Sequence, residues 1–265
     1  MILLPLNLLA ADFESTLSIS RDDLRSEIGW YAEIGRDSDE WADSDNANVE
    51  SWLKTGLRQF YTAHRWTFLE PIKTFNTVAN TGDYTLAADF GGMKGDLTFG
   101  AELSYRPIPT VGEQQIRSLR QDNTSAGIPA LAALRVQAGA SGQAGQRWTL
   151  LLYPIPDAIY ELTYRYRILP NALTADRKYP LGGEHHAETI MASCLAAAEL
   201  KLNNAKGPMW DDYLNKVAHS IEVDNQMLPE YLGYNADCSD SPPVMTRSAW
   251  RGRSNYMVTL NGVVP

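Results

Sequence analysis

The apolar residues of this 265-residue chain change their spacing twice. They recur every three to four residues up to about residue 72, then in steps of two, and return to the first spacing after Pro180. A period near 3.6 is typical of an amphipathic helix, and a period of 2 is typical of a half-buried strand. The order helices, strands, helices predicts an α+β fold in which a β region is inserted into a helical domain.

Two helices are predicted in the first region. Ser20 and Asp23 have the spacing of a capping box, which predicts a helix that starts there and ends near Gly35. A second helix is predicted to begin near Asn46. Its apolar residues form one stripe, at i, i+3, i+4, i+7, i+8 and i+11: Val49, Trp52, Leu53, Gly56, Leu57 and Phe60.

The middle of the chain contains the predicted strands. Over residues 160–168, tyrosine, leucine and isoleucine alternate with glutamate, threonine and arginine, which predicts an antiparallel strand with one face in water. Residues 111–121 are predicted to form a short helix, and the glycine-rich residues 138–145 have the composition of a hairpin tip. Shorter strand patterns occur over three further ranges: 82–86, 97–99 and 148–153.

Two more helices are predicted after Pro180, one ending near Asn203 and one starting at Pro208. The apolar face of the first contains Ile190, Met191, Cys194, Leu195, Ala198 and Leu202, and that of the second contains Trp210, Tyr213, Leu214, Val217 and Ile221. No single helix can bury its own stripe, so the four are expected to pack as a bundle. Trp52 and Phe60 should then contact the helices of Cys194 and Val217.

These patterns predict three parts of the chain. Residues 1–75 and 171–235 form the helical bundle domain, residues 76–170 form an inserted antiparallel β domain, and residues 236–265 form an extended C-terminal arm. The net charge of −9 argues against a nucleic-acid binder coated in lysine and arginine. Residues 241–265 nevertheless carry +3, against −12 on the rest of the chain.

The arm contains too little apolar surface to fold alone, but it can bind a partner. Arginines form paired hydrogen bonds with carboxylates, a tryptophan can fill a pocket, and Tyr256–Leu260 can add as a strand to a neighbouring sheet. The alternative is a frayed tail without a partner. The predicted partner-binding residues are Arg247, Trp250, Arg251, Arg253, Tyr256 and Leu260.

Candidate chemical sites are few, and each lacks a required feature. Glu184–Glu188 contains two adjacent histidines, which point about 100° apart on a helix and lack HExxH spacing. The acidic residues Asp37–Asn46 fail the EF-hand pattern, and Gly139–Gly145 lacks P-loop spacing. Cys194 lies in an apolar helical stretch and is expected to be a small core residue. Cys194 and Cys238 are too far apart in the sequence to form a CxxC motif. We therefore expect no catalytic residue, no cofactor and no bound metal.

The first ten residues, Met1–Ala10, are apolar but lack the basic start of a signal peptide and are interrupted by Pro5. No stretch approaches the roughly 18 apolar residues expected of a membrane helix. The sequence therefore predicts neither export nor a membrane partner, and a reducing compartment is expected.

Several segments, in order, resemble the portal-bound head-to-tail adaptor proteins of tailed bacteriophages. Trp52–Tyr61 with Trp66–Leu69 is similar to the opening motif of that family. Gly145–Tyr160 is similar to a segment of relatives that carry an inserted β domain, and Ala197–Glu199 and Leu232–Asn235 also match. Together these segments cover about two-thirds of the chain.

The resemblance implies a structural virion protein made in the host cytoplasm and located in the neck of the particle. Such subunits form a ring, usually dodecameric, beneath the portal, and their C-terminal arm grips the portal. The implied partners are further copies of the chain, the portal protein and a downstream tail or neck protein. Genome DNA passes through the channel without sequence-specific binding, because an acidic lumen repels its phosphates.

Three other functions are compatible with the sequence. The first is another phage protein of the neck or a tail terminator; the order of elements, with helices first and last, argues against a mainly β tail-tube subunit. A carbohydrate- or peptide-binding module could use the tyrosines of the β domain, and a hydrolase could bring distant acids together on folding. A ring with a central channel in negative-stain images favours the adaptor, and a monomer favours the others.

Overall fold

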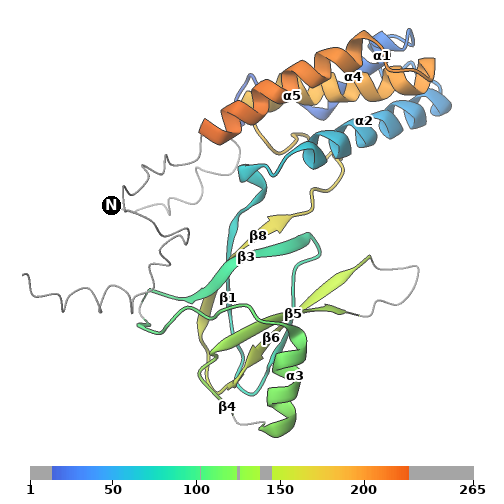
Figure 1. Ribbon diagram of the computed structural model, residues 1–265. Helices are drawn as coiled ribbons and strands as arrows, with labels where there is room; N and C mark the ends of the chain where they lie inside the picture. Colours follow the sequence, from blue (N-terminus) through green and yellow to red (C-terminus); the bar gives the residue numbers. More distant parts are fainter. Residues whose placement is uncertain (1–13, 102, 124–125, 138–144, 227–265) are drawn as a thin grey trace, which may run out of the picture. The chain divides into compact units, whose positions relative to one another are not determined.

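The computed structural model describes residues 14–101, 103–123, 126–137 and 145–226 (Figure 1). Over these residues the chain is a mixed α+β fold with antiparallel sheets, as predicted. They form two compact units, and the chain passes from the first to the second after Glu70 and back after Arg167. The first unit is helical and is built from both ends of the described chain, while the second contains all the strands. No described helix has the length and apolarity needed to cross a membrane.

The helical unit is a bundle of α1 (Arg21–Tyr31), α2 (Asp43–Ala63), α4 (Ala187–Asn203) and α5 (Pro208–Gln226), which lie side by side in Figure 1. Two short 3-10 turns, η2 (Thr67–Leu69) and η3 (Glu184–His186), flank it. Trp52, Phe60 and Cys194 belong to one buried core cluster, and Val217 packs against it. The predicted contacts between the two pairs of helices are therefore confirmed.

The start of α1 is the predicted capping box. Asp23 N–H donates to Ser20 Oγ at 3.2 Å, and Ser20 N–H donates to the Asp23 carboxylate at 2.9 Å. The helix ends at Tyr31 and not near Gly35. The reason lies in the backbone, because Glu33 (φ +61°) and Gly35 (φ +108°) adopt left-handed conformations that cannot continue an α-helix.

Helix α2 begins three residues before the predicted Asn46, with Asp43 and Asp45 in its first turn, where acids interact favourably with the helix dipole. All six residues of its predicted stripe are buried. Gly56 lies against α4 so closely that a Cβ atom added there would lie 2.5 Å from Cys194 Cα. Ser193 Oγ also donates to the Gly56 carbonyl at 2.8 Å, so the two backbones are locked together at this crossing.

The predicted faces of α4 and α5 are correct only in part. On α4, Ile190, Cys194 and Ala198 are buried, but Leu202 is 45% exposed. On α5, Tyr213 is buried, but Leu214 is 48% exposed. Helix α4 packs against the helices α1, α2 and α5, so it is buried on more than one face. The additional buried residues are small: Ala192, Ser193, Ala196 and Ala197.

Hydrogen bonds between buried polar groups, and not the predicted Leu214, join α5 to the rest of the bundle. Ser220 shares a 2.6 Å hydrogen bond with Thr189, and the Asp224 carboxylate accepts from Thr67 N–H and, at 2.7 Å, from Thr67 Oγ1. Glu199 on α4 accepts from the N–H groups of Gly207 (3.0 Å) and Trp210 (3.1 Å), which caps the start of α5.

The second unit consists of β1 (Ile72–Asn76), β2 (Asp83–Thr85), β3 (Phe90–Phe99), β4 (Ala126–Gly127), β5 (Leu131–Gln137), β6 (Arg147–Tyr153), β7 (Ile155–Pro156) and β8 (Glu161–Ile168), with the helix α3 (Glu113–Asp122). Two antiparallel sheets have the orders β1-β8-β3 and β2-β6-β5, and β4 and β7 form a short parallel pair.

Strand β8 has the predicted alternation, since Leu162, Tyr164 and Tyr166 are buried and the intervening residues face outward. The predicted short helix is α3, whose Ile116 packs on the sheet with Ala133 and Leu151. Strand β5, which carries Ala133, was not predicted.

Several predictions lie outside the described residues. They are the apolar start Met1–Ala10, most of the hairpin tip 138–145, and the arm 236–265. The six predicted partner-binding residues are all in the last of these: Arg247, Trp250, Arg251, Arg253, Tyr256 and Leu260.

Candidate functional site

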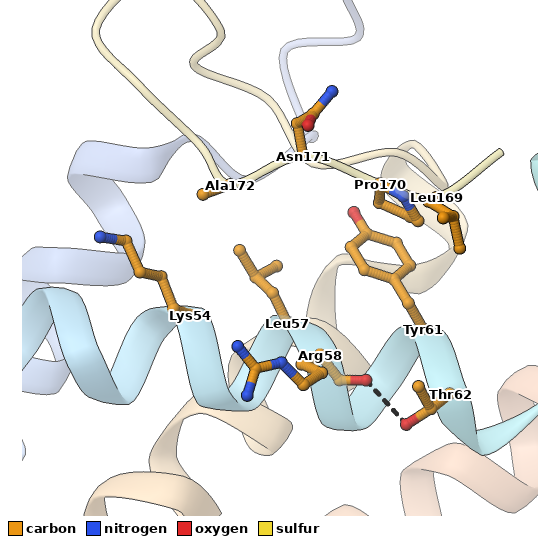
Figure 2. A pocket seen from close by; sticks show the side chains of 9 residues that line it. All are labelled: Lys54, Leu57, Arg58, Tyr61, Thr62, Leu169, Pro170, Asn171 and Ala172. Carbon is orange, nitrogen blue, oxygen red and sulfur yellow. Dashed lines mark hydrogen bonds between the residues drawn. The ribbon is translucent and has the colours of Figure 1, made fainter. Parts of the chain in front are cut away.

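A pocket of about 280 Å³ lies in the helical unit, between α2 and the segment Leu169–Ala172 that follows β8. Figure 2 shows Leu57 and Tyr61 pointing from α2 towards this segment. The volume is slightly below the roughly 300–1,000 Å³ typical of small-molecule sites. The complete lining is Lys54, Leu57, Arg58, Tyr61, Thr62, Leu169, Pro170, Asn171 and Ala172.

The floor of the pocket is apolar and its rim is basic. Lys54 and Arg58 are one helical turn apart on α2, and both side chains are exposed. Neither forms an ion pair with another residue of the described ranges. Two uncompensated cations beside apolar side chains favour a ligand that is both apolar and negatively charged.

The one hydroxyl in the pocket floor is already engaged. Tyr61 OH accepts from Leu181 N–H at 2.9 Å and donates to the Leu181 carbonyl at 3.2 Å. Burial also raises the pKa of Tyr61 far above its ordinary value. The phenol therefore ties helix α2 to Leu181, in the segment that precedes η3. It is unsuited to proton transfer near neutral pH.

A second surface surrounds the end of α1. Trp30 is 61% exposed, and the Arg36 guanidinium lies 5.1 Å from the centre of its ring. Arg36 also forms an ion pair with Glu27 at 2.7 Å. Beside them is an open groove of about 720 Å³, lined by Glu27, Trp30, Tyr31, Glu33, Ile34, Gly35, Leu195 and Met209. Tryptophan is one of the residues that most often anchor a protein contact.

The structure separates the two adjacent histidines. His185 is exposed, whereas His186 is buried with its ring 5.0 Å from Trp66 and 5.2 Å from Phe68. The Glu184 carboxylate accepts a hydrogen bond from Ser15. In the ranges that the structure describes, no three metal-ligating side chains come together.

Burial also decides the chemistry of Cys194. Its side chain is fully buried, which raises the pKa of the thiol to about 12. A thiol with so high a pKa is not a nucleophile at neutral pH. Cys194 is the small core residue that its surroundings in the sequence predicted.

Stability should fall in mild acid because of His186. Burial lowers its pKa below the ordinary 6.5, His185 adds to this, and Asp224 opposes it. Below pH 6.5 the unfolded chain therefore takes up a proton at this residue that the folded chain does not. The free energy of unfolding falls with decreasing pH below about 6.5, by at most about 1.4 kcal/mol per pH unit from this residue. Urea unfolding across this pH range should show that His186→Phe reduces the slope. An unchanged slope in His186→Phe would contradict the prediction.

Neither the pocket nor the Trp30 surface was predicted from the sequence. The two sides of the pocket are more than a hundred residues apart in the chain, so no local pattern marks it. The cation pair at Lys54 and Arg58 was a detectable signal, because basic side chains at i and i+4 on the outer face of a predicted helix share one surface.

Comparison with known protein families identifies one family. Residues 21–230 match the family described as SU10 adaptor protein. No curated protein matches the chain. The matched residues include all four helices of the bundle and the whole β unit. The chain therefore belongs to the SU10 adaptor protein family, a family of phage adaptors that are structural components of the virion.

Proposed function

We propose that this chain is a head-to-tail adaptor that forms a ring below the portal of a tailed phage. The ring extends the DNA channel and provides the surface to which the tail attaches. The observation that carries this proposal is the family match over residues 21–230, which spans the bundle and its insertion. Family membership also supports contacts with other capsid or tail proteins.

The chemistry of the described residues supports a structural role and not a catalytic one. The pocket on α2 contains an engaged phenol and two cations, and the only described cysteine is a buried thiol. The pocket on α2 therefore acts by binding a partner through its shape and charge. The net charge of −9 supports a channel wall along which DNA slides without adhering.

The C-terminal arm, residues 236–265, is proposed to hold the portal. Its arginines Arg247, Arg251 and Arg253 pair with carboxylates, Trp250 fills a pocket, and Tyr256–Leu260 extends along a neighbouring chain. The support is the composition of the arm, which combines three arginines and a tryptophan with few other large apolar residues.

Deletion of residues 241–265 tests this proposal. The truncated protein should melt at the same temperature as the full chain, because the bundle core lies within residues 19–221, but it should no longer bind purified portal in a pull-down. A matched control replaces Thr246, Ser248 and Ser254 with alanine, which keeps the length and charge of the arm. If the truncated protein still binds portal and joins heads to tails, the arm is not the docking element.

A further inference from the structure

Among the described residues, the Trp30 ring is covered only in part, by the Arg36 guanidinium 5.1 Å from its centre. Its indole on α1 is 61% exposed. Its neighbours Glu27, one turn earlier, and Glu33, just beyond the helix, are charged. Tryptophan is among the residues that contribute most to protein interfaces when they become buried. The core of the bundle is formed without Trp30, so its ring is available for a contact between molecules.

The surroundings of Trp30 are acidic. Glu27 and Glu33 line the groove beside it, and Arg36 pairs with Glu27, so Glu33 has no ion pair among the described residues. The chain then continues into Asp37, Asp39 and Glu40, which are exposed and form no ion pair with the residues described. A partner surface for Trp30 should therefore combine an apolar hollow with positive charge.

The pocket on α2 has both properties. Its volume of about 280 Å³ suits one large side chain, and its floor of Leu57, the Tyr61 ring and Pro170 is apolar. Lys54 and Arg58 supply two cations at its rim. The basic tail of the chain, with +3 over residues 241–265, would be repelled by this rim, so it is the less suitable occupant.

We propose that Trp30 of one copy inserts into the α2 pocket of the next copy. Lys54 and Arg58 then face Glu27 and Glu33 across the contact. The Trp30 groove and the α2 pocket have no residue in common, so each copy presents a different surface to each neighbour. Such a head-to-tail contact generates a ring when the rotation between copies closes. The inference rests on the proposed ring and identifies the surfaces that form it.

Mixing two defective variants tests the contact directly. Trp30→Ala keeps a normal pocket, and the double variant Lys54→Glu, Arg58→Glu keeps a normal tryptophan. Each alone should associate about 30-fold or more weakly than the unmodified chain, the loss expected of an interface hot spot. Mixed together, they should form one-to-one dimers in sedimentation and native mass measurements, because one intact contact remains and both free ends are defective.

Two controls separate this contact from general effects. Leu214→Ala removes an exposed apolar side chain on α5, and Lys201→Glu reverses an exposed charge on α4, each outside both surfaces. Both should associate normally, and circular dichroism should show that all variants are folded. The proposal is overturned if the unmodified full chain stays monomeric up to its solubility limit, if Trp30→Ala associates normally, or if the mixture stays monomeric.

Portal binding is scored in a separate pull-down, so the two proposals can fail independently. Dimers in the mixture without portal binding would overturn the adaptor function and leave the contact intact. Portal binding by the unmodified chain with a mixture that stays monomeric would overturn the contact alone.

Discussion

Gly56→Leu is expected to lower the free energy of unfolding of the helical unit by about 4 kcal/mol or more, and Gly56→Ala by about 2 kcal/mol. A Cβ at this position would lie 2.5 Å from Cys194 Cα and 2.8 Å from Cys194 N. These are backbone atoms, which cannot rotate away as a side chain can. Helices α2 and α4 would have to separate, and the hydrogen bond from Ser193 Oγ to the Gly56 carbonyl would be lost.

Urea unfolding followed by circular dichroism at 222 nm measures the change in free energy. Gly112→Ala is the matched control, since Gly112 has an ordinary φ of −66° and no atom within 4 Å of an added Cβ. Because Gly112 is the N-cap of α3, a position that prefers glycine to alanine, its effect should stay within about 1 kcal/mol, below that of Gly56→Ala. Equal stability of Gly56→Ala and the unmodified chain would show that the two helices can separate without cost.

Glu199→Ala is expected to lower the free energy of unfolding by about 3 kcal/mol. The Glu199 side chain is buried and accepts hydrogen bonds from the N–H groups of Gly207 and Trp210 at the start of α5. Tyr31 OH on α1 also donates to it, at 3.4 Å. Alanine would leave the two amide groups without an acceptor in a place where the folded bundle limits access to water.

Glu199→Gln separates hydrogen bonding from charge. Its amide oxygen can accept both N–H groups, so the losses are the attraction between a carboxylate and the helix dipole and the 3.4 Å hydrogen bond from Tyr31, and a decrease of about 1 kcal/mol is expected. Urea unfolding of the two variants under the same conditions gives the comparison. A glutamine variant as unstable as the alanine variant would show that charge, and not hydrogen bonding, holds the start of α5.

The parts of the fold that were predictable are those with strong local signals. The stripe of α2 from Val49 to Phe60 and the alternation in β8 both describe elements with one buried face and one exposed face. The capping box at Ser20 depends on two residues three apart. In each case the relevant contact is encoded within a few residues.

The predictions failed where burial is set by distant parts of the chain. Leu202 and Leu214 continue a helical stripe but are 45% and 48% exposed, while Ser220 and Asp224 are buried because Thr189 and Thr67 satisfy them. Strand β5 is rich in alanine, and its burial depends on α3 and β6.

The candidate site was unpredictable for a similar reason. The α2 pocket exists only because Leu169–Ala172 passes over Leu57 and Tyr61. The position of Glu199 at the start of α5 likewise follows from the turn between α4 and α5, which brings Gly207 back towards it.

The β unit is an insertion between the two halves of the helical bundle. It leaves through β1 and returns through β8, and these strands pair directly, with Ile72 opposite Arg165 and Tyr166 N–H donating to the Pro71 carbonyl. Opposed residues in such a pair lie about 5 Å apart, which two or three residues can span. Residues 71–167 can thus be exchanged or removed during evolution while the two halves of the bundle stay connected through a short loop.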